Sequence, residues 1–342
     1  MIFTFIGAIV LVILLLLIII AEAILNTASF GKRCEGNENL KYMQAEDFEC
    51  LQGSAISFRS DKNQNLNGFI YSSTEFNEYK ALIIFSHGMG AGHLSYTTEI
   101  NYFAQKGYLV LAFDNTGTCS SEGKRLYGFP QGIIDLKSAL NFVAENDKLN
   151  NLPILLMGHS WGAYSVCNVS ALGTDCTIKG IVAFSPFDSI NCLIGDSAKA
   201  KIGVGLKFLY PFFNIINFIH FGKKGLLKSC DTISSNSIPT LIMHGKLDAI
   251  VHLSNSPVGL KDRLIANRNA KTVLYENKYH NVYLSEDAEK YLNDVFGKIN
   301  SLTAGSNEIK ELYGSIDYEL ITKEDTKVMN SVFKFFEECI KK

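Results

Sequence analysis

The sequence predicts an α/β domain, with a mostly parallel eight-stranded sheet and helices on both faces, behind one N-terminal transmembrane helix. Two observations predict the sheet: a series of short, continuous apolar runs, and helical patterns between these runs. Continuous apolar runs are typical of strands that are buried on both faces of a parallel sheet. A chain of 342 residues, 47% of them hydrophobic, is long enough to give such a domain a large core.

Residues 1–25 are predicted to be a transmembrane anchor. From Ile2 to Ala21 only Thr4 is polar, and about 20 apolar residues in a helix span the ~30 Å hydrocarbon layer. The alternative is a cleaved signal peptide and a secreted protein, because Ala21-Glu22-Ala23 has the small-x-small form of a cleavage site. Against it, the run is longer than the usual apolar region of about 7–15 residues, and no basic side chain precedes it.

Basic residues predict the orientation of the chain in the membrane. Lys32, Arg33 and Lys41 follow the anchor, so the positive-inside rule places the C-terminal domain in the cytoplasm of a single-pass protein. The eight cysteines form no CxxC pair and no metal-type spacing, and we expect free, mostly buried thiols. The net charge of −2 is interspersed and argues against a nucleic-acid partner.

The secondary structure is predicted from the pattern of apolar residues. Residues 26–53 are expected to form a polar linker, followed by a hairpin of residues 55–59 and 68–71. Helices are expected over 133–146 and from Trp161 onward. The six further strands are expected at residues 81–85, 108–113, 153–157, 180–184, 240–243 and 272–275.

The strongest local motif is Gly158-His159-Ser160-Trp161-Gly162, which follows a buried run and precedes a helix rich in small residues. A strand, GxSxG and a helix in this order are typical of a nucleophile elbow, where a serine lies on a sharp, strained turn. The N-terminus of the helix would supply N–H groups and a positive dipole end to an oxyanion. Ser160 is therefore the predicted nucleophile.

A nucleophilic serine needs a base and a carboxylate that orients the base. In an open parallel sheet, functional groups gather at the carboxyl ends of the strands. Asp248 and His280 follow the last two predicted strands, so we expect Asp248 to orient His280, and His280 to activate Ser160. The alternative carboxylate is Asp188, which follows the strand before them.

The other histidines are expected to have structural roles. His159 would pack or hydrogen-bond inside the serine turn, and His87 and His244 would stabilise turns at strand ends. Asp114 and Asp135 are also expected to be structural. Surface positions are expected for His93, His220 and His252.

A second glycine-rich turn, Ser86-His87-Gly88-Met89-Gly90, follows the predicted strand 81–85. There the backbone N–H of Met89 would join that of Trp161 to form an oxyanion hole. The alternative is a glycine-rich turn without a donor role.

Together these motifs resemble the α/β-hydrolase superfamily, especially its monoglyceride-lipase-like and serine-aminopeptidase-like (S33-type) branch. The resemblance covers roughly residues 54–295 and rests on residues 87–90, the GxSxG turn, and the Asp248 and His280 loops. One loop departs from the family pattern Asp-x-Arg-Gly-x-Gly-x-Ser. It reads Asp114-Asn115-Thr116-Gly117-Thr118-Cys119-Ser120, without the arginine and the second glycine.

The resemblance implies that residues 187–237, which lack a strand pattern, form a helical cap inserted into a hydrolase domain of residues 54–342. Residues 207–221 are expected to form an amphipathic helix, whose apolar face either packs on the domain or covers an acyl chain and touches the bilayer. That face would hold Phe212, Ile215, Ile216 and Ile219, opposite Asn214, Asn217 and His220. A helical extension is expected over residues 286–342, with helices at 286–299 and 326–340.

The sequence therefore predicts a membrane-anchored serine hydrolase that cleaves carboxylic esters through an acyl-enzyme, without a metal or organic cofactor. The cap and the anchor favour a small-molecule or lipid ester, such as an acylglycerol or a lysophospholipid. One alternative is a serine peptidase or amidase, in which Asp188 or Asp196 binds a peptide N-terminus. The other is a noncatalytic binding protein on the same scaffold.

Overall fold

The computed structural model describes residues 2–25, 30–90, 92–202, 207–303 and 306–341. Residues 26–29 of the predicted linker and 203–206 of the predicted cap lie outside the described residues. Within the described part, the strands form one eight-stranded sheet in the order β1-β2-β4-β3-β5-β6-β7-β8. The strands are β1 (Leu51–Arg59), β2 (Asn65–Ser73), β3 (Leu82–Ser86), β4 (Leu109–Phe113), β5 (Ile154–His159), β6 (Ile178–Phe184), β7 (Thr240–Gly245) and β8 (Ala270–Tyr275).

The sheet confirms the predicted architecture. β1 pairs antiparallel with β2, β2 pairs antiparallel with β4, and the other neighbours are parallel. Every residue of β3, β4 and β5 is buried, as the continuous apolar runs predict. The hairpin strand β1 starts at Leu51, earlier than the expected start of that strand at residue 55.

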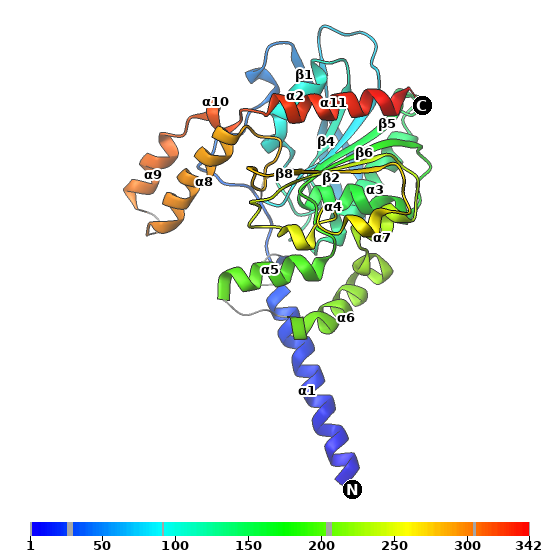
Figure 1. The fold of residues 1–342 in the computed structure, drawn as a ribbon, viewed down its shortest axis with the longest axis vertical. Helices are drawn as coiled ribbons and strands as arrows, with labels where there is room; N and C mark the ends of the chain where they lie inside the picture. Colours follow the sequence, from blue (N-terminus) through cyan, green and yellow to red (C-terminus); the bar gives the residue numbers. More distant parts are fainter. Residues whose placement is uncertain (1, 26–29, 91, 203–206, 304–305, 342) are drawn as a thin grey trace.

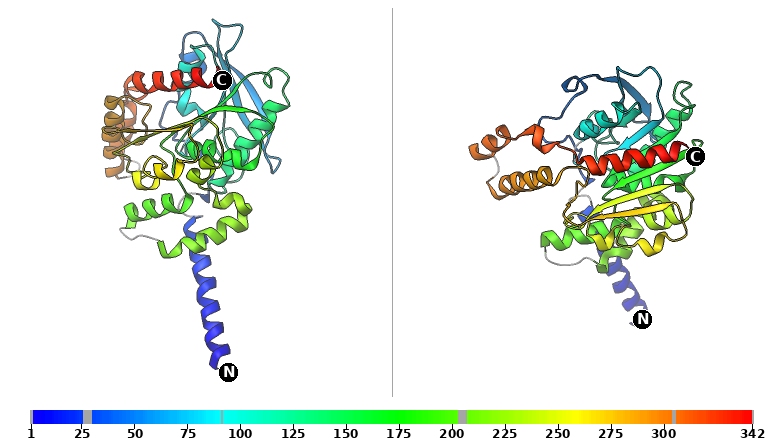
Figure 2. Two further views of the ribbon diagram at one scale, coloured as in Figure 1. Left: turned by 45° about the vertical axis from the view of Figure 1, so that its right-hand side comes forward. Right: turned by 45° about the horizontal axis from the view of Figure 1, so that its top comes forward.

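Helices cover both faces of the sheet (Figure 2). α3 (Pro130–Ala144), α4 (Trp161–Asn168) and α7 (Ser229–Ser234) pack on one face, while α2 (Thr97–Ala104) and α11 (Thr326–Ile340) pack on the other. Alternate residues of each central strand enter the two cores. In β3, for example, Ile84 belongs to the first core and Ile83 to the second.

One long apolar helix, α1 (Ile2–Leu25), extends out of the body, and the cap helices α5 (Ile190–Ile202) and α6 (Tyr210–Phe221) lie beside its base (Figure 1). Residues Thr4–Leu25 are long and apolar enough to cross a membrane. The end of α1 is part of the body, because Ala21 and Leu25 are buried in the core. The last turn of α1 is therefore packed into the domain.

The cap helix α6 packs with a different face from the one expected. Its buried residues are Phe213, Ile216, Asn217 and Phe221, whereas Ile215 and Ile219 are exposed. The expected grouping therefore placed Ile215, Ile219 and Asn217 on the wrong sides. The helical period fixes which residues share a face, but the contact with α1 and the sheet decides which face is buried.

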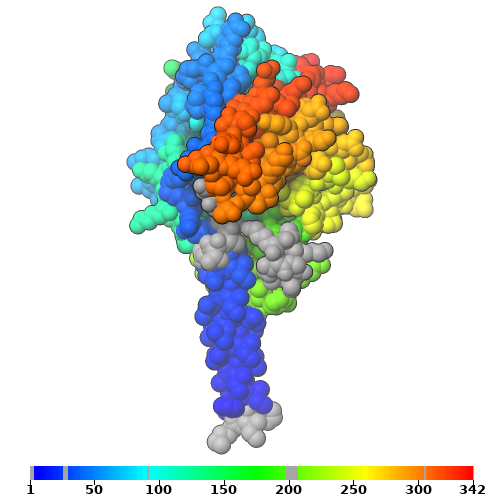
Figure 3. Space-filling view, turned by 90° about the vertical axis from the view of Figure 1, so that its left-hand side faces the viewer, coloured from blue at the N-terminus to red at the C-terminus, as the bar shows by residue number. Residues whose placement is uncertain are grey.

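In the residues that the structure describes, the C-terminal extension contains four helices. α8 (Glu286–Ser301), α9 (Asn307–Gly314) and α10 (Tyr318–Ile321) cover one side of the body, next to the linker (Figure 3), and α11 crosses the sheet. The linker and the extension are hydrogen-bonded, since Asn37 Nδ2 donates to the Tyr313 hydroxyl at 2.7 Å, and Lys41 N donates to the Tyr318 hydroxyl at 2.8 Å. The extension is thus an integral part of the fold.

The cysteines are all free thiols. Cys167, Cys230 and Cys339 are buried, and the other five are half-buried, so the expectation of mostly buried thiols is wrong. The three buried thiols lie in helices that pack on the sheet. Of the others, Cys192 lies in α5, and Cys34 and Cys119 lie outside the regular helices and strands.

The packing of α11 gives a first prediction. Phe336 is fully buried between α11 and the sheet, with its ring centroid 5.8 Å from that of Phe103 in α2. Phe336→Ala should lower the free energy of unfolding by about 3 to 5 kcal/mol, because it leaves a cavity in a closed core. Urea unfolding followed by circular dichroism measures the change. The exposed neighbour Lys334, changed to Ala, should stay close to wild type, and equal effects would contradict this packing.

Candidate active site

Ser160 lies on the sharp turn between β5 and α4. Its φ of 53° and ψ of −113° are strained for a residue with a side chain. The turn is held by backbone hydrogen bonds, since Ser160 N donates to Phe184 O at 2.8 Å and Tyr164 N donates to Ser160 O at 2.9 Å. The glycines of the motif are needed sterically: a Cβ on Gly162 would overlap the Ser86 carbonyl oxygen.

Asp248 and His280, far apart in the sequence, are hydrogen-bonded to each other. His280 Nδ1 lies 2.7 Å from Asp248 Oδ2, and Asp248 Oδ1 accepts the N–H groups of Ile250 and Val251, each at 2.9 Å. Burial by itself would raise the pKa of Asp248, but the neighbouring imidazoles of His280 and His244 outweigh it and lower this pKa. Asp248 is therefore a carboxylate at neutral pH and orients the ring of His280.

A cavity of about 770 Å³ lies over the serine turn. Four of the five predicted site residues line it: Ser160, Trp161, His280 and Met89. Asp248 is the fifth, and it is bonded to the ring of His280. The remaining wall is largely apolar and comes from the end of α1 (Ile24, Leu25), the cap (Leu193, Ile194) and the C-terminal extension (Leu292, Phe296).

Several residues that the sequence analysis missed hold the His280 loop. The carbonyl of His280 accepts a hydrogen bond from Ser185 Oγ at 2.6 Å and lies 3.2 Å from His159 Nε2. The buried carboxylate of Glu289, from α8, accepts the N–H groups of Tyr279 at 3.0 Å and Asn281 at 2.8 Å. These bonds fix the backbone on both sides of the imidazole.

His159 is structural, as predicted. Its Nδ1 lies 2.9 Å from the Tyr96 hydroxyl, and burial holds the pKa of His159 well below its usual value. His159 is therefore neutral, and it links the serine turn to the His280 loop. His244 is also buried and turn-stabilising, with Nε2 3.0 Å from Val251 O.

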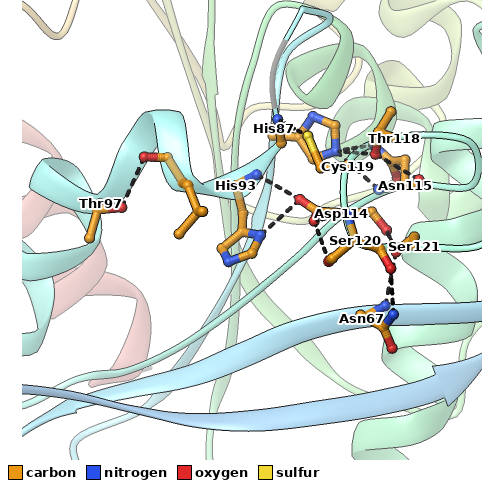
Figure 4. Close-up of polar contacts among 12 residues, drawn as sticks. Asn67, His87, His93, Thr97, Asp114, Asn115, Thr118, Cys119, Ser120 and Ser121 are labelled. Atoms are coloured by element: carbon orange, nitrogen blue, oxygen red, sulfur yellow. Dashed lines mark hydrogen bonds and ion pairs between the residues drawn. The ribbon is translucent and has the colours of Figure 1, made fainter. Parts of the chain in front are cut away.

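The loop that departs from the family pattern is built around a buried ion pair of Asp114 and His93 (Figure 4). Asp114 Oδ1 accepts His93 N at 2.9 Å and lies 2.8 Å from His93 Nδ1, and Ser120 Oγ donates to Oδ2 at 2.6 Å. The expectation that His93 lies at the surface is wrong. The carboxylate of Asp114 is buried and needs hydrogen-bond donors beside it, and His93 is one of them. His220 and His252 are exposed, as expected.

The loop lacks the arginine of the family pattern, and an arginine from the linker supports the loop instead. Arg33, from the linker, donates to Cys119 O at 2.7 Å, to Ser121 O at 2.9 Å and to Gly123 O at 2.6 Å. His87 Nε2 accepts Asn115 N at 3.0 Å, which joins the loop to the glycine-rich turn that holds Met89. Asp135 is structural as expected, because it accepts Thr116 N at 2.7 Å.

The two alternative acidic residues are engaged elsewhere. Asp188 pairs with Arg263 at 2.8 Å and accepts Cys230 N at 2.9 Å. Asp196 accepts Asn255 Nδ2 at 2.7 Å and lies 3.4 Å from His252. Neither lines the cavity among the described residues. Within that part of the chain, no group of three or more His, Cys, Asp or Glu side chains is arranged to hold a metal ion.

Comparison with known proteins identifies the fold. The family model described as serine aminopeptidase, S33, matches residues 77–214. The Pyrococcus furiosus esterase Pf2001 superposes with a TM-score of 0.57 at 18% identity, over 79% of this chain and 97% of the esterase. The chain has the α/β-hydrolase fold.

Further solved structures share this α/β-hydrolase fold. Est1E from Butyrivibrio proteoclasticus, with ferulic acid bound, has a TM-score of 0.56 and 18% identity, over 84% of this chain and all of Est1E (100%). Porphyromonas gingivalis dipeptidyl peptidase 4 has a TM-score of 0.51 and 18% identity, over 79% of this chain and 36% of the peptidase. No curated protein matches the sequence.

Asp114 gives a prediction about pH. Burial would raise the pKa of Asp114, but His93, His87 and Ser120 outweigh it and lower this pKa. Asp114→Asn should lower the free energy of unfolding at neutral pH by about 3 kcal/mol, because it breaks a buried ion pair. Since the carboxylate form is favoured in the folded state, this contribution is complete above about pH 5 and is lost as the pH falls below about 4.

Urea unfolding of wild type and Asp114→Asn over a range of pH measures this effect. The difference in free energy should be constant from neutral to mildly acidic pH and should then shrink. Exposed Asp147, changed to Asn, is the control and should show no difference at any pH. A difference for Asp114→Asn that persists unchanged in strong acid would contradict the role of the charge.

Glu289 gives a prediction about positioning. With His280 as the predicted base, Glu289→Ala should slow the labelling of Ser160 by a fluorophosphonate about 100-fold, because small displacements of such a base have large effects on rate. Glu289→Gln, which keeps one acceptor, should recover part of the rate. Exposed Glu286, on the same turn of α8, should tolerate Ala with a wild-type rate. Equal rates for both alanine variants would show that the Glu289 contacts do not position His280.

Proposed function

We propose that this α/β-hydrolase is a membrane-anchored serine hydrolase of carboxylic esters, with Ser160 as nucleophile, His280 as base and Asp248 as the orienting carboxylate. The observation that carries the proposal is the 2.7 Å hydrogen bond between Asp248 and His280, behind a cavity that Ser160 and His280 both line. In a serine hydrolase, this bond fixes the tautomer of the imidazole and stabilises the imidazolium.

The proposed reaction has two halves. His280 Nε2 takes the hydroxyl proton of Ser160 while Oγ attacks the ester carbonyl carbon, and the N–H groups of Met89 and Trp161 hold the oxyanion. His280 then gives the proton to the leaving alcohol, which leaves an acyl group on Ser160. A water molecule, deprotonated by His280, attacks the acyl-enzyme, and the carboxylic acid and the free serine are formed.

The lining of the cavity favours an ester with an apolar acyl group over a peptide. A peptidase that binds a free N-terminus needs a carboxylate facing the substrate, and Asp188 and Asp196 are both paired away from the cavity. Glu99 does border the cavity, but burial raises its pKa well above its usual range, which favours the neutral acid. The apolar residues around the serine are those expected for an acylglycerol, a lysophospholipid or a similar acyl ester.

The location in the cell is part of the proposal. α1 would cross the membrane once, and the basic residues that follow it would keep the hydrolase domain in the cytoplasm.

The proposal is tested with a fluorophosphonate and two families of substrate. Wild type should be labelled, and Ser160→Ala should not. Asp248→Asn should keep the fold and lower kcat on p-nitrophenyl acyl esters about 10⁴-fold, because the imidazole takes the wrong tautomer. Thr98→Ala, a change at the cavity wall outside the proposed triad, should retain most of the activity.

The same assays separate the alternatives. Hydrolysis of p-nitrophenyl acyl esters well above that of aminoacyl-p-nitroanilides is the expected result, and the reverse preference would favour the peptidase. A folded wild-type protein that takes no fluorophosphonate label would refute the proposal in favour of a noncatalytic binding protein.

A further inference from the structure

The apolar stretch of α1 continues into the part of the helix that packs against the body. This stretch, Thr4–Leu25, is about 33 Å long at about 1.5 Å per residue, and the hydrocarbon layer is about 30 Å thick. From Leu17 onward α1 packs against the body: Leu17, Ile18 and Ile24 are half-buried against the core, and Ala21 is fully buried. The first charged side chain of the sequence is Glu22. If α1 spans the membrane, the hydrocarbon layer therefore has to extend past the point where the body begins.

The element found at that level is the cap helix α6. It lies beside the base of α1 in both views (Figures 1 and 2), and His220 Nε2 lies 3.2 Å from Glu22 Oε1. Its outer face is apolar, with exposed fractions of 42% for Ile215, 51% for Phe218 and 69% for Ile219. Their spacing puts these three side chains on one side of the helix.

The charged residues on both sides of α6 also favour a position of this helix at the membrane. Lys207 precedes the helix, Lys223 and Lys224 follow it, and an apolar face flanked by lysines is typical of a helix that lies in the membrane interface. Glu22 and His220 contact each other where the apolar part of α1 ends, so polar side chains of α1 and α6 meet at the same level.

The catalytic cavity reaches the same region. Ile24 and Leu25, in the last turn of α1, and Leu193 and Ile194 of α5 line the cavity that also contains Ser160. An apolar path thus joins the end of the membrane helix to the serine turn.

We propose that α6 lies in the bilayer interface with Ile215, Phe218 and Ile219 in contact with lipid, and that the cavity takes the acyl chain of its ester directly from that leaflet. The first half of this proposal rests on α1 as the proposed membrane anchor and requires no enzymatic activity. The second half rests on the proposed function, because it requires Ser160 to hydrolyse a lipid ester.

A quenching experiment tests the position of α6 without any assay of activity. Phe218→Trp and Ser57→Trp are each reconstituted in nanodiscs of phosphatidylcholine, with or without bromine on the acyl chains. Ser57 is exposed on β1, which lies on the part of the body away from α1 (Figure 1). After subtraction of wild-type emission, which comes from buried Trp161, the tryptophan at 218 should lose roughly half of its emission to the bromines. The tryptophan at 57 should be unaffected, and equal emission of both in the two lipids would overturn the proposal.

A kinetic experiment tests the lipid route. In nanodiscs that carry a long-chain monoacylglycerol, Ile219→Glu should lower kcat/KM about tenfold, because a charge on the outer face of α6 resists insertion. Turnover of water-soluble p-nitrophenyl butyrate should match wild type, and Ile219→Leu and Ser57→Glu should behave like wild type on both substrates. An unchanged kcat/KM for the monoacylglycerol in Ile219→Glu would overturn the lipid route.

The two experiments distinguish failure of this inference from failure of the proposed function. If wild type hydrolyses neither ester, the proposed function fails and the lipid route fails with it, while the quenching result still decides where α6 lies. If both esters are hydrolysed but the tryptophan at 218 is not quenched, the proposed function stands and the position of α6 is refuted.

Discussion

The close approach of α4 to β3 is the constraint on which the site depends. Gly162 lies so near the carbonyl oxygens of Ser86 and His87 that no side chain fits between them. This contact sets the separation of the serine turn, which ends β5, and the glycine-rich turn, which ends β3. The predicted oxyanion donors, the N–H groups of Trp161 and Met89, belong to these two turns, so this backbone contact sets how far apart the two donors lie. The strained φ of Ser160 is maintained by the same packing.

The strands and the meeting of Asp248 with His280 were predictable because their signals are local. Each buried strand is a continuous apolar run, and Ser160, Asp248 and His280 follow directly after strand ends. The outcome for the supporting residues was different. Arg33 contacts carbonyl groups more than 80 residues away, and Glu289 contacts the His280 loop from a helix whose local sequence gives no sign of it. Such contacts depend on how elements pack, and no short pattern encodes them.

Two of the errors of sequence reasoning, those for His93 and for α6, have related causes. His93 was assigned to the surface because no partner was near it in sequence, but Asp114 lies 21 residues further on and is buried beside it. In α6 the helical period was right and the choice of the buried face was wrong. The presence of α1 beside the helix changes which side chains find apolar neighbours, and Asn217 is buried while Ile219 is not.

The burial of Ala21 and Leu25 in the core makes α1 continuous with the hydrolase domain. A helix that is packed into its domain in this way changes its angle together with the domain. Where a bilayer is thinner or thicker than the apolar length of the helix, the helix tilts to compensate, and here the whole domain would have to tilt with it. With α1 as the proposed anchor, lipid composition would set the angle between the entrance of the cavity and the plane of the membrane. Lipids would then reach the serine at an angle that differs between membranes of different thickness.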